Sequence, residues 1–255
     1  MTYCKDIISF LEKTAPPELA EQWDNIGLLV GRPANTVKKI LVCLDVTHAA
    51  IDEAVKTGAD MIVTHHPVIF KGIKRLNEDE KTAGFIYSLI RNNISVYSAH
   101  TNLDFADQGV NTCLADILGL RQTEVLGRGP GKAGILEEKL SLEEFIARVK
   151  TSLEVPFVRV AGRADLGILK AAVFSGSFDD DLEAVAASGA DVLVTGDLKY
   201  HTALDAREMG MCIVDAGHFN TEKVVLPQLA KELQRGFSEV AVTCFRDEKD
   251  PLITT

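Results

Sequence analysis

The strongest constraint on the fold is an alternation of apolar and amphipathic stretches that occurs twice along the chain. In the first half, apolar runs at 38–47 and 60–65 flank a helical pattern that ends at Gly58. A further helix over 78–93 leads to a strand over 94–99. β-Branched runs that alternate with helical stretches predict βαβ units and a parallel sheet. The first half is therefore expected to be an α/β lobe.

The second half repeats this alternation at a spacing of 131 residues. Residues 40–66 align with 171–197 without a gap, and the helix end at Gly58 falls on Gly189. Such a match favours duplication, although short βαβ units also resemble one another because they share apolar strands and glycine helix ends. The elements expected here are a strand over 170–178, a helix over 179–189, a strand over 191–196, a helix over 200–209 and a strand over 211–216.

A glycine-containing segment separates the two halves. Its G-x-G-x-x-G string, which begins at Gly129, matches the dinucleotide-binding fingerprint. However, no clear strand precedes the string, and the next helix starts only at the capping box that begins at Ser141. We therefore interpret the segment as a linker between two similar α/β lobes with parallel or mixed sheets, 1–125 and 126–255. A helix over 142–153 and a strand over 157–161 are assigned to the second lobe.

Composition limits the classes of partner. The formal net charge of −10 repels polyanions and so disfavours broad nucleic-acid binding, while a small anionic ligand held by a few local cations is still compatible. No stretch reaches the roughly 20 apolar residues that cross a bilayer. The five cysteines are odd in number and contain no C-x-x-C pair, which indicates reduced core residues. We therefore expect a cytoplasmic protein.

Ligand-type side chains follow the ends of four expected strands, and ligands gather at the carboxyl ends of strands in parallel α/β sheets. His65 and His66 end one strand, His100 and Asp104 follow a second, and Asp197 and His201 follow a third. His218 and Glu222 are spaced i, i+4, so a helix that begins near Asn220 would place both on nearly one side. The candidate metal ligands are His65, His66, Asp104, His218 and Glu222. For each alone, a hydrogen-bonded or surface role is the alternative.

The adjacent histidines pose a geometric problem, because neighbouring side chains of a regular strand point to opposite faces. One metal ion could take both imidazoles only if the chain turns there, and Pro67 favours such a turn. Two nearby ions that share the pair are the other solution. A set of imidazoles and carboxylates without thiolate suits Zn, Fe, Mn or Co. The side chains are too few to fill two coordination spheres, so water is expected at open positions, which indicates chemistry.

Other polar residues have weaker patterns. Lys71, Lys74 and Arg75 form either a solvated loop or a phosphate-binding edge beside the histidines. His100 and His201 are candidates for proton transfer. The segment that contains the single tryptophan, Trp23, and runs through Ile26 to Val30 is explained by core packing.

Five motifs in this order resemble the Nif-three-like family, whose members are named GTP cyclohydrolase I type 2 homologues. They are WDNIGLLVG, THHPVIF, SAHTNLD, TGDLKYH and DAGHFNTE, and they extend over nearly the whole chain. The resemblance implies a site for two divalent metal ions between two similar lobes, held by His65, His66, Asp104, His218 and Glu222. It also implies a ring-shaped homohexamer. The chain resembles the short form, which lacks an inserted domain.

The resemblance and the charged residues lead to three functional hypotheses. The first is a metal-dependent hydrolase of a phosphorylated, purine-like small molecule; with GTP, water would attack C8 of the base and formate would leave. The second is a phosphoesterase, since paired metals serve both reactions. The third is a protein without catalysis, either a ring that stores or delivers metal or an adaptor for a protein partner.

Overall fold

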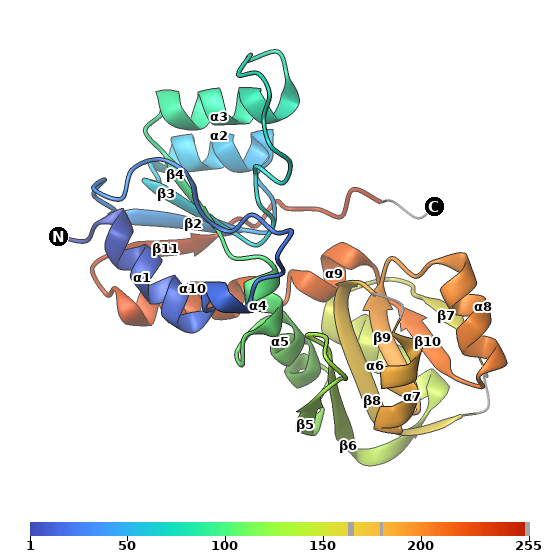
Figure 1. Ribbon diagram of the computed structural model, residues 1–255. Helices are drawn as coiled ribbons and strands as arrows, with labels where there is room; N and C mark the ends of the chain where they lie inside the picture. Colours follow the sequence, from blue (N-terminus) through green and yellow to red (C-terminus); the bar gives the residue numbers. More distant parts are fainter. Residues whose placement is uncertain (163–165, 179–180, 253–255) are drawn as a thin grey trace. The chain divides into compact units, whose positions relative to one another are not determined.

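The computed structural model describes residues 1–162, 166–178 and 181–252, and these form two compact units (Figure 1). Unit 1 contains Met1–Ala106 and Leu226–Pro251, and unit 2 contains Asp107–Val225 together with Leu252. Each unit has one mixed β-sheet with helices on both of its faces. The expected α/β class with two lobes is confirmed.

Unit 1 contains a five-stranded sheet in the order β1-β4-β3-β2-β11, in which only β1 is antiparallel to its neighbour. The strands are β1 (Gly27–Val30), β2 (Lys39–Cys43), β3 (Met61–Thr64), β4 (Ser95–Ser98) and β11 (Ala241–Cys244). The helices are α1 (Cys4–Thr14), α2 (His48–Thr57), α3 (Lys81–Arg91), α4 (Thr101–Phe105) and α10 (Val225–Gly236), and a 3-10 turn, η1, spans Pro17–Leu19.

Helices α2 and α3 cover one face of this sheet, and α1 and α10 cover the other (Figure 1). Ile51 of α2 and Leu89 of α3 pack in one cluster with Leu41 and Ile62 of the strands. Burial on both faces explains why all four residues of β3 are apolar or hydroxylic and fully enclosed. Their burial fixes the end of β3, and with it the position of the residues that follow.

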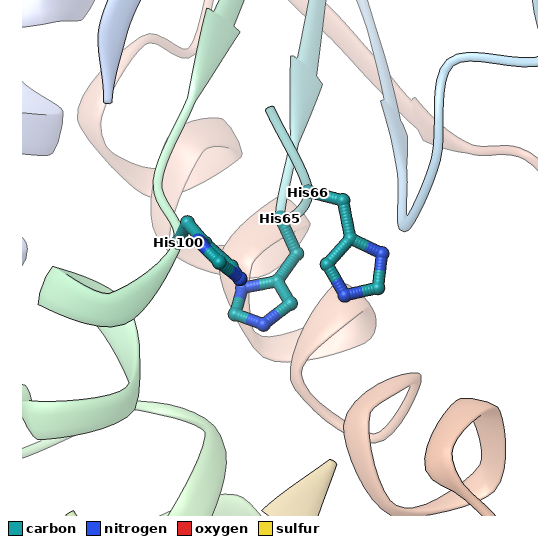
Figure 2. A group of neighbouring side chains, drawn as sticks. All are labelled: His65, His66 and His100. Carbon is teal, nitrogen blue, oxygen red and sulfur yellow. The ribbon is translucent and has the colours of Figure 1, made fainter. Parts of the chain in front are cut away.

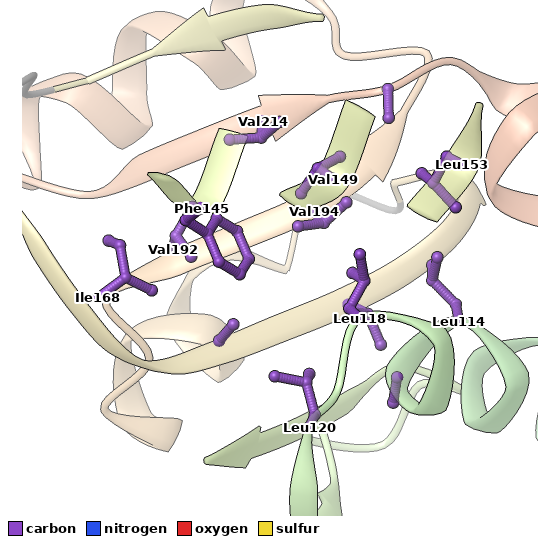
Figure 3. Close-up of a cluster of buried hydrophobic side chains, with 14 of the residues drawn as sticks. Leu114, Leu118, Leu120, Phe145, Val149, Leu153, Ile168, Val192, Val194 and Val214 are labelled. Atoms are coloured by element: carbon purple, nitrogen blue, oxygen red, sulfur yellow. The ribbon is translucent and has the colours of Figure 1, made fainter. Parts of the chain in front are cut away.

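Unit 2 contains a six-stranded sheet in the order β5-β6-β8-β9-β10-β7. The strands are β5 (Arg121–Val125), β6 (Lys132–Ser141), β7 (Arg159–Ala161), β8 (Gly167–Ser177), β9 (Val192–Gly196) and β10 (Cys212–Asp215). The helices are α5 (Val110–Ile117), α6 (Leu142–Leu153), α7 (Leu182–Ser188), α8 (Tyr200–Glu208) and α9 (His218–Glu222). Figure 3 shows one face of its core, where Phe145 and Val149 of α6 lie against Val192 and Val194 of β9.

The repeat seen in the sequence is also present in the pairing of strands. Val42 of β2 lies opposite Val63 of β3, and Val173 of β8 lies opposite Val194 of β9, so both pairs have the same register. In each unit an antiparallel strand, β1 or β7, closes the sheet beside the third parallel strand of the repeat. The two βαβαβ frameworks are therefore built alike.

A carboxylate makes the same contacts in both repeats. The Asp60 Oδ2 atom accepts the backbone N–H groups of residues 38 and 39 at 2.7 and 3.0 Å. The Asp191 Oδ2 atom accepts those of residues 169 and 170 at 2.8 and 2.9 Å. Each carboxylate accepts from the two backbone N–H groups that directly precede the first parallel pair with the next strand of the repeat, Ile40 with Met61 in one unit and Ala171 with Val192 in the other. This shared detail supports the duplication more strongly than shared apolar positions do.

The interpretation of the glycine-containing segment as a linker is wrong. Strand β5 precedes it, β6 follows it, and the two pair as an antiparallel hairpin in which Leu126 N–H donates to Gly131 O at 2.8 Å. The exposed, polar sequence of β5 hid this strand, because all five of its residues face solvent. The element after the glycines is a strand instead of a helix, so the segment also lacks the context of a dinucleotide loop.

The unit boundaries also differ from the expected division between residues 125 and 126. Residues 107–125 lie in unit 2, because β5 pairs with β6. Residues 226–251 lie in unit 1, because β11 pairs in parallel with β2. The return of the C-terminal segment depends on pairing between strands about 200 residues apart, which local sequence patterns do not reveal.

Within the repeats, the expected elements match the observed ones apart from their ends. The first two residues of the helix expected over 179–189 lie outside the described residues, and α7 begins at Leu182. All five cysteines are free thiols. Among the described residues, no helix has both the length and the apolar character needed to cross a bilayer.

Candidate metal centre

Three histidines converge beyond the carboxyl ends of β3 and β4 in unit 1 (Figure 2). His65 and His66 follow β3, and His100 lies between β4 and α4. The His65 ring lies 5.0 Å from the His66 ring and 5.2 Å from the His100 ring, and the His66 and His100 rings are 5.6 Å apart. One nitrogen from each lies within 4.8 Å of the others, so the three imidazoles could hold a metal ion together.

The chain turns directly after β3, and this turn brings the adjacent histidines together. Strand β3 ends at Thr64, whose hydroxyl donates a hydrogen bond to the carbonyl oxygen of His66 at 2.8 Å. The two imidazole planes are inclined by 43° and do not lie on opposite faces of the sheet. Pro67 follows immediately, and because it has no backbone N–H it cannot donate a hydrogen bond to a neighbouring strand.

Oxygen atoms hold the Nδ1 side of the unit 1 imidazoles. The His65 Nδ1–H group donates to the carbonyl oxygen of Ala99 at 2.9 Å, and the His66 Nδ1 atom lies 3.1 Å from Asp45 Oδ1. When Nδ1 carries the proton, Nε2 has the lone pair that a metal ion requires. The backbone and the carboxylate thus favour the tautomer in which Nε2 is the ligand atom, as in many metal sites.

Asp24 fixes the third imidazole. Its Oδ1 atom accepts from His100 Nδ1 at 2.8 Å, and its Oδ2 atom accepts from the backbone N–H of Thr101 at 3.0 Å and from the Thr101 hydroxyl. The Asp24 side chain is fully buried. Burial raises the pKa of Asp24, but the hydrogen bonds from His100 and Thr101 outweigh it and hold the pKa well below its usual range. The lowered pKa favours the ionised form of Asp24 at neutral pH, and its Oδ1 atom orients His100.

Asp104 lies on the short helix α4, one turn after His100. Its Oδ1 atom is 3.7 Å from His65 Nε2. Unit 1 therefore brings together His65, His66 and Asp104, the three residues expected from this half of the chain. It also adds His100, for which the sequence suggested proton transfer only.

Unit 2 contains the remaining imidazole and carboxylate pair. Helix α9 begins at His218, two residues before the expected start near Asn220, with Gly217 as its N-cap. The His218 Nε2 atom lies 3.0 Å from Glu222 Oε2, and its Nδ1 atom lies 2.8 Å from Asp197 Oδ2. His218 thus resembles His66 and His100 of unit 1 in having a carboxylate at Nδ1, and it resembles His65 in having a candidate ligand carboxylate near Nε2.

Gly176 of β8 leaves room for Glu222. The residue has a φ of +65°, and a Cβ atom at this position would overlap with Glu222 Oε1. Its backbone N–H donates to the hydroxyl of Thr221 at 3.0 Å, which holds the last turn of α9 against the strand. The carboxylate therefore occupies a space that only glycine provides.

The other candidate residues are dispersed. His201 is exposed in the first turn of α8, where its ring contacts Tyr200 at 5.3 Å. Lys71 lines a cavity beside His66, whereas Lys74 and Arg75 are exposed and are not among its described lining residues.

The interpretation of Trp23 as a core residue is wrong: its side chain is 60% exposed. It packs edge-on against another exposed aromatic residue, Phe70, at 5.8 Å.

Sequence analysis did not assign a role to the two carboxylates that hold imidazoles, Asp24 and Asp197. Asp24 lies 76 residues before its partner His100, so no local spacing joins them. A signal for Asp197 was present, because the offset of 131 residues places it on His66. Its backbone has a φ of +48°, which aspartate tolerates better than most residues.

Comparison with known proteins identifies the family. The sequence matches Duf34/NIF3 (NGG1p interacting factor 3) over residues 2–251. Two relatives are each named "GTP cyclohydrolase 1 type 2 homolog". The one from Clostridium perfringens is 39% identical over 96% of this chain and 97% of its own, and the one from Clostridium acetobutylicum is 37% identical over 93% and 92%.

Solved structures agree with these sequence matches. A Bacillus cereus protein related to NIF3 superposes with a TM-score of 0.94 at 29% identity and covers 99% of both chains. Reduced HcgD from Methanocaldococcus jannaschii superposes with a TM-score of 0.82 at 32% identity, over 95% of this chain and 97% of that one. Since the matches extend over nearly the whole sequence, the chain belongs to the Duf34/NIF3 family.

Proposed function

We propose that the protein is a divalent-metal-dependent hydrolase of a phosphorylated, purine-like small molecule. His65, His66 and Asp104 of unit 1 and His218 and Glu222 of unit 2 would together hold two ions of Zn, Fe, Mn or Co. The observation that carries the proposal is the state of the imidazoles: His65, His66, His100 and His218 each have an oxygen atom at Nδ1. All four contacts favour the same tautomer, with the proton on Nδ1. Imidazoles that only pack against neighbours or bond to solvent have no need of this shared tautomer.

The donor set fits divalent metal ions, because it combines neutral imidazole nitrogens with carboxylates that offset the charge of a cation. When bound, such ions supply Lewis acidity and water that ionises near neutral pH. The protein's own side chains would have two tasks: to hold the substrate in place, and to transfer the proton that the attacking water loses. His100 suits this second task, because Asp24 holds its Nδ1–H and leaves Nε2 to accept a proton and return it. The names of the relatives support a purine substrate such as GTP.

The proposal predicts turnover that depends on both halves of the ligand set. Protein loaded in turn with each of the four metals is incubated with GTP, GMP and a phosphate monoester, and formate and inorganic phosphate are measured. His65→Ala and Glu222→Ala are each expected to reduce turnover at least a hundredfold and to release metal, because each removes a ligand. Release of formate would identify a cyclohydrolase, and release of inorganic phosphate would identify a phosphoesterase. Activity unchanged in both variants would refute the proposal.

A binding protein without catalysis is the second candidate, and the family description, which names an interacting factor, favours it. A carrier or adaptor would exchange its metal readily and turn over none of the substrates. Competition with a graded series of chelators, run beside the activity assay, separates the two. Tight retention with turnover supports the hydrolase, whereas rapid exchange without turnover supports the carrier.

We also propose the ring-shaped homohexamer that the resemblance implies. A chain of 27.7 kDa predicts a particle near six times that mass. Light scattering during size-exclusion chromatography measures it directly, and a monomer at micromolar concentration would contradict the ring.

A further inference from the structure

A cavity of about 340 Å³ lies in unit 1 beside the three histidines. Its lining includes Asp45, His66, Phe70, Lys71, Lys81 and Phe85. His66 therefore belongs both to the cavity and to the candidate metal group. A ligand in the cavity would have one end beside the imidazoles.

The charges of the lining are divided between two parts of the chain. Asp45 lies 3.1 Å from His66, so the negative charge is at the histidine end. Lys71 follows the histidine turn, and Lys81 is the first residue of α3. The two lysines against one carboxylate leave the lining with one net positive charge. An anionic group is therefore attracted to the lysines and repelled from Asp45.

The start of α3 adds to this attraction. The N-cap residue, Glu80, makes no side-chain capping hydrogen bond, and the first turn contains no acidic residue. Lysine is disfavoured at the first position of a helix, because the helix N-terminus is itself positive. An anion beside Lys81 and Thr82, both of which line the cavity, would offset both charges.

The remaining walls are apolar and aromatic. Phe85 is buried, whereas Phe70 is 50% exposed and contacts both Trp23, at 5.8 Å between centroids, and His100, at 6.2 Å. A largely apolar wall with a small number of placed polar groups is the usual form of a small-molecule site. The volume is at the small end of the range for such sites, roughly 300–1,000 Å³.

We propose that this cavity binds the phosphate of a small phosphomonoester, with Lys71 and Lys81 at the phosphate and the organic part directed towards His66. The inference rests on the proposed function, whose substrate it narrows. A phosphomonoester carries a charge of about −1.5 to −2 at pH 7, which Lys71 and Lys81 together offset, whereas a triphosphate carries more negative charge than two lysines offset. The volume also suits one phosphate with a small organic part. The site thus selects monophosphates over GTP.

Binding of GMP to the metal-depleted full-length protein tests this inference, with guanosine and GTP as comparison ligands. The single tryptophan, Trp23, touches the cavity wall at Phe70, so its fluorescence reports occupancy, and calorimetry gives the affinity. GMP is expected to bind at least tenfold more tightly than guanosine, and GTP no more tightly than GMP. Equal affinities for GMP and guanosine, binding of neither, or tighter binding of GTP would overturn the proposal.

Variants locate the phosphate. Lys81→Ala is expected to weaken GMP binding about tenfold and Lys81→Arg less than threefold. Lys56→Ala removes another exposed lysine, on helix α2, and should leave binding unchanged. Lys74→Ala should have a smaller effect than Lys81→Ala; an equal effect would place the anion on the outer loop and overturn the assignment. Circular dichroism confirms that each variant is folded.

The two proposals can fail separately. GMP binding is measured without metal and without turnover. Binding that depends on Lys81 in a protein that hydrolyses nothing refutes the hydrolase and leaves the phosphate site intact. Turnover in a protein whose GMP affinity does not depend on Lys81 refutes the phosphate-binding cavity and leaves the hydrolase proposal standing.

Discussion

Replacing Gly176 with alanine is expected to lower the affinity of the protein for divalent metal by tenfold to a hundredfold. The added Cβ would overlap with Glu222 Oε1, so the carboxylate must leave its position beside His218. Displacing a group that orients or supplies a metal ligand typically has an effect of this size. The measurement is metal content after dialysis against a chelator series, determined by mass spectrometry for the wild type and the variant.

A second glycine in the same unit provides the control. Gly189 has a φ of +71°, close to that of Gly176, but its Cβ would meet no atom within 4 Å. Both alanine variants therefore bear a similar backbone cost, about 1 kcal/mol for an L-residue in the left-handed region. Only Gly176→Ala should lose metal. Equal metal content in the two variants would show that Glu222 does not contribute to the site.

Replacing Asp24 with alanine is expected to lower the free energy of unfolding by about 3 kcal/mol, because the buried anion is lost and its hydrogen-bond donors keep no acceptor. Asp24 accepts hydrogen bonds from His100, from both donors of Thr101, and from the backbone N–H of Asn25 at 2.7 Å. In the alanine variant these donors have no acceptor at this position. Urea unfolding of metal-free protein at pH 7 measures the loss, and Asp52→Asn, at an exposed carboxylate of α2, should change it by less than about 0.5 kcal/mol.

The difference in unfolding free energy between the wild type and Asp24→Asn is expected to depend on pH. The folded state lowers the pKa of Asp24, so its contribution to stability is present above the unfolded pKa, about 3.9, and is lost as pH falls towards the folded pKa. The wild type should therefore lose its advantage over Asp24→Asn as pH falls from about 5 to 3. Unfolding curves at four pH values in this range test the sign. A difference that stays constant with pH would mean that folding does not shift the pKa of Asp24, and a difference that grows as pH falls would mean that folding raises this pKa.

The framework of the fold could be read from the sequence. Apolar strands and capped helices have periodicities of two and 3.6 residues, which are local properties. Helix α6 was predicted at its observed bounds, because its capping box at Ser141 and its buried stripe lie within a few residues of one another. Strand β5 was missed for the opposite reason: its five exposed side chains carry no burial pattern, and only pairing with β6 makes it a strand.

The candidate site shows the same division. The sequence alone determined the chemical types of the site residues and their place after the strands, because parallel strands present their carboxyl ends at one edge of a sheet. Which atoms meet depends on contacts between segments that are distant in the sequence. Asp24 contacts His100, which lies 76 residues later in the sequence. Gly176 makes room for Glu222. Lys81 lines the cavity together with Lys71, whereas the sequence had suggested Lys74. Such contacts depend on the close packing of distant segments, and packing has no local period that a sequence could reveal.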